Sequence, residues 1–261
     1  MEHDISSENP PRLTFGNLSG VPGLFHGVYT RHGGVSAPPY DSLNVADNNG
    51  DAPGAVRENL TRIKVAAGVE WLVSSRQVHG DALHFIDRAS AEKLEARPPT
   101  LVAPPADALA TDLSGLGLLI KIADCQSILL VDPQSRIIAN IHSGWRGSLM
   151  DIAGGTIRRL VRFGLKPATT LAAVSPSLGP CCAEFVNYQR EIPEKFWPFR
   201  VGPLHFDFWA ITRSQLLAAG LCEENIEFAA KCTVCGKSDF FSYRGQGETG
   251  RMASIIGWKR P

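Results

Sequence analysis

Residues 124–147 read DCQSILLVDPQSRIIANIHSGWRG, and the rest of the chain is organised around this stretch. Two apolar runs, residues 128–131 and 137–141, flank a cluster of turn-forming residues that begins at Asp132 and Pro133. This pattern predicts a β-hairpin. If the four residues 132–135 form the loop and Val131 faces Arg136, Cys125 falls opposite His142.

A directly opposed thiol and imidazole on one face of a hairpin could share a metal ion, because their Cβ atoms lie only about 4.5–5.5 Å apart. A third ligand was sought among His26, His32, His79, His84 and His205. We choose His79, which lies between the strand-like residues 71–73 and 83–86 and precedes Gly80, a residue suited to a tight turn. One Cys and two His match a catalytic zinc site with its fourth position open. Taken singly, each also fits an ordinary packed residue, and Cys125 a core thiol.

Length and composition fit an ordinary globular protein. The chain has 261 residues, of which 44% are hydrophobic and 20% charged, and its net charge is zero. We expect a disordered tail over residues 1–12 and a single catalytic domain over residues 13–261. No overall field favours nucleic acid or a membrane surface. The polar start, the lack of a long apolar run and six cysteines without an export signal favour a cytoplasmic protein with reduced thiols.

Helical spacing predicts three helices, over residues 56–67 with Gly68 at the C′ position, over 149–161, and over 206–217 with Asp207 as N-cap. The second should begin just beyond His142 and direct its N-terminal N–H groups at the site, where Arg146 could help to bind phosphate. Strands are expected at residues 71–73, 83–86, 117–122, 171–174, 226–230, 240–243 and 252–258. The fold class is α/β (α+β), with mixed or antiparallel sheets covered by helices.

The remaining cysteines do not predict a second metal site. Cys232 and Cys235 form a CxxC pair, but no second pair follows, and Cys222 is poorly spaced to join them. The adjacent Cys181 and Cys182 should point in different directions on a regular backbone. We therefore expect packing or incidental roles for these thiols.

Several blocks of the chain resemble the YfiH, or laccase-domain, family, in order and over nearly the whole length. They are TRHGGVSAPPYDSLN (residues 30–44), RQVHG (76–80), ADC (123–125), HSGWRG (142–147), SLGPCCAEF (177–185) and FFSYRGQGETGRMASIIGW (240–258). The resemblance implies a layered YfiH-like architecture and metal ligands at His79, Cys125 and His142. It implies a zinc-dependent purine nucleoside enzyme, with phosphorylase and adenosine deaminase activities, that takes a purine nucleoside and phosphate. Copper is the rival metal.

The resemblance also implies roles for other side chains. Catalytic roles fall on Cys125, Asp124 and Glu184, and substrate-binding roles on Arg31, Asn44, Gln77, Arg146, Cys182 and Arg244. In deamination, Asp124 or Glu184 would move protons while a zinc-activated water attacks the purine C6. In phosphorolysis, Arg31, Arg146 and helix N–H groups would hold phosphate near C1′. Many relatives carry a second Arg where this chain has Gly245, which leaves Arg244 and Arg251 to bind an anion at that edge.

Other activities remain open from the sequence. One is an amidase or editing hydrolase acting on a peptidoglycan precursor, with the zinc water or Cys125 as nucleophile; a second is a copper polyphenol oxidase, or laccase. A laccase would need a multi-copper cluster, which seven scattered His do not obviously supply. A third is a non-enzymatic partner protein that retains a zinc site.

Overall fold

The predicted hairpin is present, but its register differs from the prediction. The computed structural model describes residues 5–6 and 8–260 of the chain. Strands β9 (Gln126–Asp132) and β10 (Ile137–Ser143) pair antiparallel, with Asp132 facing Ile137. His142 therefore faces Ser127, and not Cys125 as predicted.

The loop lies one residue later than expected because Arg136 belongs to it. Arg136 has a φ of 58°, a left-handed conformation that does not continue a strand. Its carbonyl accepts a hydrogen bond of 2.7 Å from the indole of Trp258, and its guanidinium stacks on that ring. The slip amounts to two residues, so each side chain keeps its face. Cys125, just before β9, becomes a diagonal neighbour of His142 on that face.

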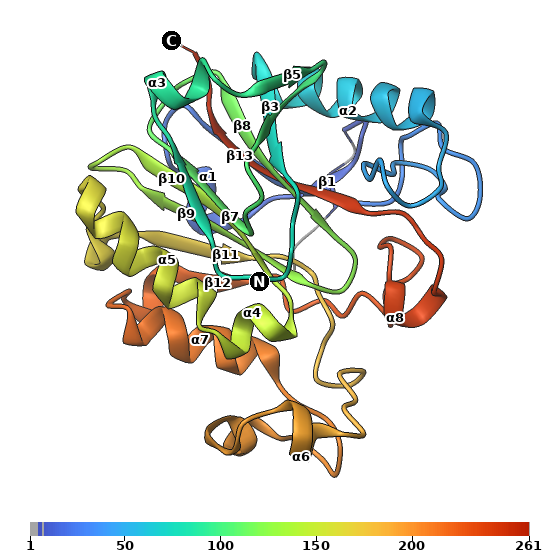
Figure 1. Ribbon diagram of the computed structural model, residues 1–261, viewed down its shortest axis with the longest axis vertical. Coiled ribbons are helices and arrows are strands. Elements are labelled where there is room, and N and C mark those ends of the chain that lie inside the picture. The colour runs from blue at the N-terminus through green and yellow to red at the C-terminus, as the bar shows by residue number, and fades with distance from the viewer. Residues whose placement is uncertain (1–4, 7, 261) are drawn as a thin grey trace.

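The strands form two sheets (Figure 1). The seven-stranded sheet has the order β1 (Arg12–Leu13), β2 (Leu24–Tyr29), β13 (Met252–Trp258), β8 (Leu116–Ile122), β3 (Trp71–Ser75), β6 (Thr100–Ala103) and β5 (Glu95–Arg97). The six-stranded sheet has the order β12 (Ile226–Phe228), β11 (Leu171–Val174), β9, β10, β7 (Ala108–Thr111) and β4 (Leu83–Ile86). Each sheet contains parallel and antiparallel pairs, as the predicted mixed class requires.

Helices border both sheets, and the short helix α1 contacts strands of each. The α-helices are α1 (Gly16–Ser19), α2 (Pro53–Ala67), α3 (Arg88–Ala91), α4 (Trp145–Leu149), α5 (Ile152–Leu160), α6 (Tyr188–Glu191), α7 (Phe208–Ala218) and α8 (Tyr243–Gln246). The 3-10 turns are Val161–Phe163, Pro167–Thr169, Glu194–Phe199 and Glu223–Asn225. Gly68 closes α2 with a φ of 64°, and the Asp207 side chain caps α7, as predicted.

The two sheets and the helices on their outer faces make four layers. This layering follows from the period-two alternation of buried residues along the central strands. In β9, Leu129 and Val131 enter the core between the sheets, while Ile128 and Leu130 pack under α5 and α7. In β8, Leu119 instead packs towards α2. Because both faces of these strands are buried, their sequences read as continuous apolar runs. Figure 1 shows α2 on one side of the paired sheets and α5 with α7 on the other.

A buried polar network joins the two sheets between the apolar layers. Asn140 of β10 donates hydrogen bonds of 2.9 Å to the carbonyls of Leu118 and Ser254 in the other sheet. Ser127 donates to Asn140 and lies 2.7 Å from the hydroxyl of Ser254. All three polar side chains are fully buried and bonded, so they fix how the sheets face each other without an unsatisfied group.

Three sequence predictions need correction. The helix expected over residues 149–161 is two helices, α4 and α5, because Asp151 adopts φ 58° and caps α5 through a hydrogen bond to the Gly154 N–H. Residues 240–243 do not form a strand; Ser242 caps α8 instead. Arg12 of the predicted tail forms β1, and Ile5 bridges Leu13, whereas residues 1–4 and 7 lie outside the described part.

Candidate functional site

His79, Cys125 and His142 converge at one end of the hairpin, as the sequence predicts. One ligand atom from each lies within 4.8 Å of the others. The Cys125 Sγ lies 4.0 Å from His79 Nε2, and the two imidazole rings meet edge to face at 4.9 Å. The three residues come from the loop after β3, the turn before β9 and the end of β10. One thiolate and two imidazoles at this spacing are a ligand set that could hold a metal ion.

Asp107 holds two of the three candidate ligands in place. This fully buried carboxylate accepts a 2.8 Å hydrogen bond from His142 Nδ1. It also accepts backbone N–H bonds from Val78, His79 and Gly80 at 2.8–3.1 Å. Binding Nδ1 leaves Nε2 of His142 to face Cys125, and binding the loop fixes His79, whose φ is 58°.

The electrostatics of the site favour a thiolate at Cys125 beside a protonated imidazole at His142. Burial alone would raise the pKa of the Cys125 thiol, but the imidazoles of His142 and His79 outweigh burial and lower this pKa to about 6. Burial would lower the pKa of His142, yet Cys125 and Asp107 raise it to about 9. Cys125 therefore sits in a setting that favours the thiolate, which is the form that binds metal.

Gly144 makes room for this arrangement. A Cβ atom at this position would lie 3.0 Å from both the Sγ of Cys125 and the Cδ2 of His79. These distances are shorter than ordinary contacts, so the two ligands can approach each other only because residue 144 has no side chain.

A cavity of about 1120 Å³ opens beside the three residues. Its lining contains seven basic side chains, Arg57, Arg76, Arg97, Lys121, Arg146, Arg244 and Arg251, against two acidic ones, Asp47 and Asp124. The chain as a whole has no net charge, so this excess of positive charge is local. Four aromatic residues, Trp145, Phe185, Phe208 and Tyr243, also contribute to the lining. The cavity can therefore receive an anion beside a flat apolar group.

Besides His79, Cys125 and His142, four of the predicted site residues line this cavity: Arg146, Arg244, Gln77 and Asp124. Arg146 is exposed and makes no ion pair within the described residues. Arg244 donates to the Glu184 carbonyl at 2.9 Å. The Gln77 amide is engaged in both directions with the backbone of Lys121, so it fixes the loop that carries His79 to β8.

Asp124 positions the C-terminal loop of the cavity. Its carboxylate accepts bonds of 2.6 Å from the hydroxyls of Thr233 and Ser242 and from the N–H of Arg244. Because these three donors occupy both carboxylate oxygens, Asp124 holds this wall of the cavity in place.

Four other predicted site residues do not line the cavity. Arg31 is buried and bonds to the carbonyls of Asp41 and Lys237. Asn44 is fully buried and hydrogen-bonds to Ala46, Asp51 and Arg251. Glu184 is exposed on the loop after β11, and Cys182 belongs to a cluster of four thiols described below. The polar groups of Arg31 and Asn44 stabilise loops beside the cavity, a role that spacing in the sequence could not reveal.

Arg251, which was expected from the sequence to bind an anion at this edge, lines the cavity, and so does Tyr243, which was not singled out. Burial lowers the pKa of Arg251, while Cys125 and Asp124 act in the opposite direction, which places this guanidinium in the field of the candidate ligands. Tyr243 is 62% exposed and lies under Arg251. The sequence pointed to Arg251 because this chain has Gly245 where many relatives carry a second Arg. For Tyr243 the sequence held no comparable signal.

The structure contradicts the prediction for the other cysteines. Cys181, Cys182, Cys232 and Cys235 lie together, with all four sulfurs within 4.8 Å of one another. The prediction assumed a regular backbone, but Cys181 and Cys182 occupy a turn closed by the Cys182 N–H and the Gly179 carbonyl. Adjacent side chains on a turn can point to the same side.

Residues 25–259 match the family model described as multi-copper polyphenol oxidoreductase laccase. The chain belongs to this laccase-domain family. Its relatives include the purine nucleoside phosphorylase YlmD of Geobacillus stearothermophilus, which is 34% identical over 248 residues and 90% of each chain. A purine nucleoside phosphorylase of Deinococcus radiodurans is 33% identical over 96% of this chain and 94% of the relative.

Solved structures of the laccase-domain family share the whole fold. The crystal structure of YlmD from Geobacillus stearothermophilus superposes with a TM-score of 0.86 at 31% identity and covers 99% of each chain. The YfiH protein of Bacillus licheniformis gives 0.85 at 26% identity, over 98% of this chain and 99% of that one. The predicted layered YfiH-like architecture is thereby confirmed.

No helix among the described residues is long and apolar enough to cross a membrane.

Proposed function

We propose that the protein is a zinc-dependent purine nucleoside phosphorylase that also deaminates adenosine. The observation that carries the proposal is the position of the cavity: a basic and aromatic lining lies beside His79, Cys125 and His142. The names of the relatives support phosphorolysis. A nucleoside and phosphate are together a flat heterocycle, a polar sugar and an anion, which this lining suits.

The ligand set suits zinc. Two imidazoles and one thiolate with Asp107 behind His142 are typical of a zinc site that keeps one position open. Zinc bound here would supply a Lewis acid and a water of lowered pKa. The description of the family names copper, but the remaining His of the described residues are elsewhere; His26, for example, accepts the Phe15 N–H at 2.8 Å. A multi-copper cluster needs more imidazoles than the site gathers.

Different side chains of the cavity would bind the phosphate and the purine. Arg146, which has no ion pair among the described residues, offers its guanidinium to phosphate, and Arg251 and Arg244 line the same cavity. The exposed ring of Tyr243 offers a surface for the purine. Fixed cations near C1′ stabilise the phosphate nucleophile where it attacks, as the bond between C1′ and the base breaks.

Product analysis tests the proposal. Zinc-loaded protein is incubated with inosine or adenosine, with and without phosphate, and the products are separated by chromatography. We expect hypoxanthine and ribose 1-phosphate from inosine only when phosphate is present, and inosine from adenosine without it. Both activities should vanish in His142→Ala and persist in Asp81→Asn, a change in an exposed carboxylate that pairs with Arg159. Cleavage of a muramyl peptide with no change in either nucleoside would refute the proposal.

A further inference from the structure

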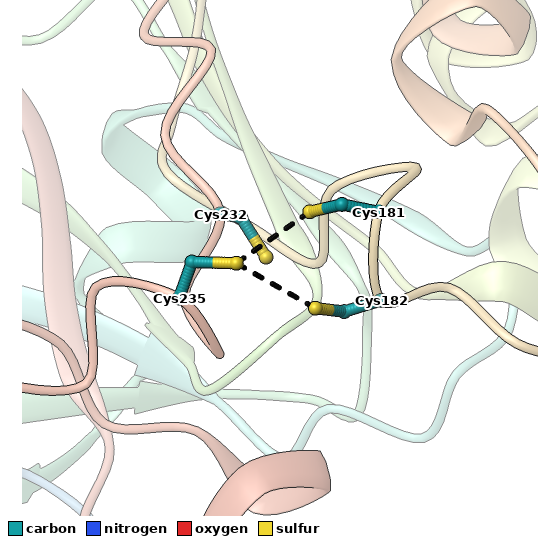
Figure 2. Close-up of side chains that lie close together, drawn as sticks. All are labelled: Cys181, Cys182, Cys232 and Cys235. Carbon is teal, nitrogen blue, oxygen red and sulfur yellow. Dashed lines mark hydrogen bonds between the residues drawn. The ribbon is translucent and has the colours of Figure 1, made fainter.

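The four-thiol cluster defined above lies outside the cavity and has no role in the proposed reaction. Figure 2 shows the side chains of Cys181 and Cys182 on one loop facing those of Cys232 and Cys235 on another. The Sγ of Cys235 lies 3.6 Å from the sulfurs of both Cys181 and Cys182. All six cysteines of the chain are free thiols.

These distances fit one tetrahedral ion. Four sulfurs at a Zn–S distance of about 2.3 Å lie about 3.8 Å from one another. The observed distances of 3.6 Å, with no pair beyond 4.8 Å, are close to that geometry. Four thiolates are a ligand set that selects zinc among the common divalent ions and leaves no open position.

The backbone brings the two loops together before any ion binds. Ser177 and Cys232 form a parallel bridge, with the Thr233 N–H donating to the Ser177 carbonyl at 3.0 Å. Gly179 permits the closest approach, because a Cβ there would lie 2.9 Å from the Cβ of Cys232. Each cysteine pair also sits in its own turn, closed at the Gly179 and Cys232 carbonyls. The sulfurs are therefore placed by the fold, and not by flexible side chains alone.

Basic residues lie beside the cluster in the sequence. Lys231 and Lys237 flank the CxxC segment and can offset the charge of four thiolates around a divalent ion.

We propose that Cys181, Cys182, Cys232 and Cys235 bind one zinc ion as a closed structural site, distinct from the three-ligand centre. The ion would join the loop after β11 to the segment that leads into α8. That segment carries Thr233, Ser242 and Arg244, the three donors that hold Asp124. Binding of zinc by the four thiols would therefore make one wall of the substrate cavity rigid.

Zinc stoichiometry tests the site. The reduced full-length protein is loaded with Zn²⁺ without oxygen, desalted and measured by mass spectrometry of the metal. We expect about two zinc ions per chain in the wild type and about one in either Cys235→Ser or the double variant His79→Ala/His142→Ala. Cys222→Ser is the matched control, because this thiol lies outside both clusters, and it should retain both ions.

X-ray absorption at the zinc edge separates this inference from the proposed function. In His79→Ala/His142→Ala, the remaining zinc should show about four sulfur neighbours at about 2.3 Å, whatever the activity of the wild type. Cys181→Ser serves if Cys235→Ser does not fold. The inference is overturned if the double variant binds no zinc, or if its zinc shows nitrogen or oxygen neighbours in place of the four sulfurs.

Discussion

Asp107 is the residue on which the geometry of the candidate ligands depends most. Its two oxygens accept four hydrogen bonds, one from His142 and three from the backbone of residues 78–80. The hydrogen bonds from His142 and from these N–H groups outweigh burial, which raises the pKa, and lower the pKa of Asp107 below its usual value. The carboxylate therefore stays ionised and holds Nδ1 of His142, which leaves Nε2 as the atom directed at a metal.

We expect Asp107→Asn to weaken zinc binding at the three-ligand centre by about 10–100-fold. The amide keeps the size of the side chain but offers one acceptor oxygen where the carboxylate offers two. Competition with a chromophoric chelator measures the affinity, and Asp81→Asn serves as the surface control. An unchanged affinity in Asp107→Asn would show that the carboxylate does not orient the ligands.

Gly144 sets how closely Cys125 and His79 can approach. Its φ of −76° is open to any residue, so Gly144→Ala should change packing without straining the backbone. We expect lower zinc affinity with a melting temperature close to that of the wild type. Gly155→Ala in α5 is the matched control, because the nearest atom to its Cβ would lie at an ordinary 3.8 Å. A Gly144→Ala protein with wild-type affinity would contradict the steric argument.

At the scale of elements, the break between α4 and α5 decides what lies at the end of the hairpin. Only α4 begins near His142, and its five residues carry a weaker dipole than the single long helix expected from the sequence. The basic side chains of the cavity, and not a helix terminus, therefore supply most of its positive potential.

Asp151→Ala should destabilise the protein by about 1–2 kcal/mol, because alanine loses the cap of α5 and tolerates the left-handed backbone poorly. Urea denaturation measures this loss. Asp151→Asn keeps a capping oxygen and adopts left-handed conformations readily, so its cost should be smaller. Equal costs in the two variants would mean that the ion pair with Arg158 matters more than the cap.

The sequence predicts elements well where one physical rule acts alone. Strands at residues 83–86, 171–174 and 252–258 match β4, β11 and β13, because their apolar runs are bounded by turn formers. The hairpin register failed because Arg136 takes a left-handed conformation that depends on Trp258, more than a hundred residues away. The strand predicted over residues 240–243 is absent because Ser242 bonds to Asp124 and caps α8.

The centre of the candidate site was predictable from the sequence, and its walls were predictable only in part. The three ligands follow from the hairpin and from the family resemblance, and a register slip of two residues keeps Cys125 on the face of His142. Arg31 and Asn44 look like substrate-binding residues in the sequence, yet their polar groups are used inside the fold. The four-thiol cluster joins turns about fifty residues apart, which only the tertiary fold brings together.

At the scale of the whole molecule, His26 makes stability depend on pH. It lies on β2, is 6% exposed and accepts the N–H of Phe15. Burial lowers its pKa from 6.5 to about 4. As pH falls from 6.5 to 4, the unfolded chain binds the proton before the folded chain does, so the free energy of unfolding decreases, by about 3 kcal/mol once pH is below 4.

We expect His26→Gln to lose this share of the pH dependence, because glutamine can accept a hydrogen bond but does not titrate. Urea denaturation between pH 7 and pH 4 gives the slope for each protein. A His26→Gln protein whose slope equals that of the wild type would assign the pH dependence to other groups.

The measurement that tests the account most directly is the rate of base release from inosine at increasing phosphate concentration, with ribose 1-phosphate assayed in the same samples. For the zinc-loaded wild type we predict a rate that saturates with phosphate and yields base and ribose 1-phosphate in equal amounts. Arg146→Met should need at least about 10-fold more phosphate to reach half its maximal rate, Arg162→Met should match the wild type, and Cys125→Ala should release no base. Base release that is independent of phosphate, or that continues without Cys125, would contradict the account.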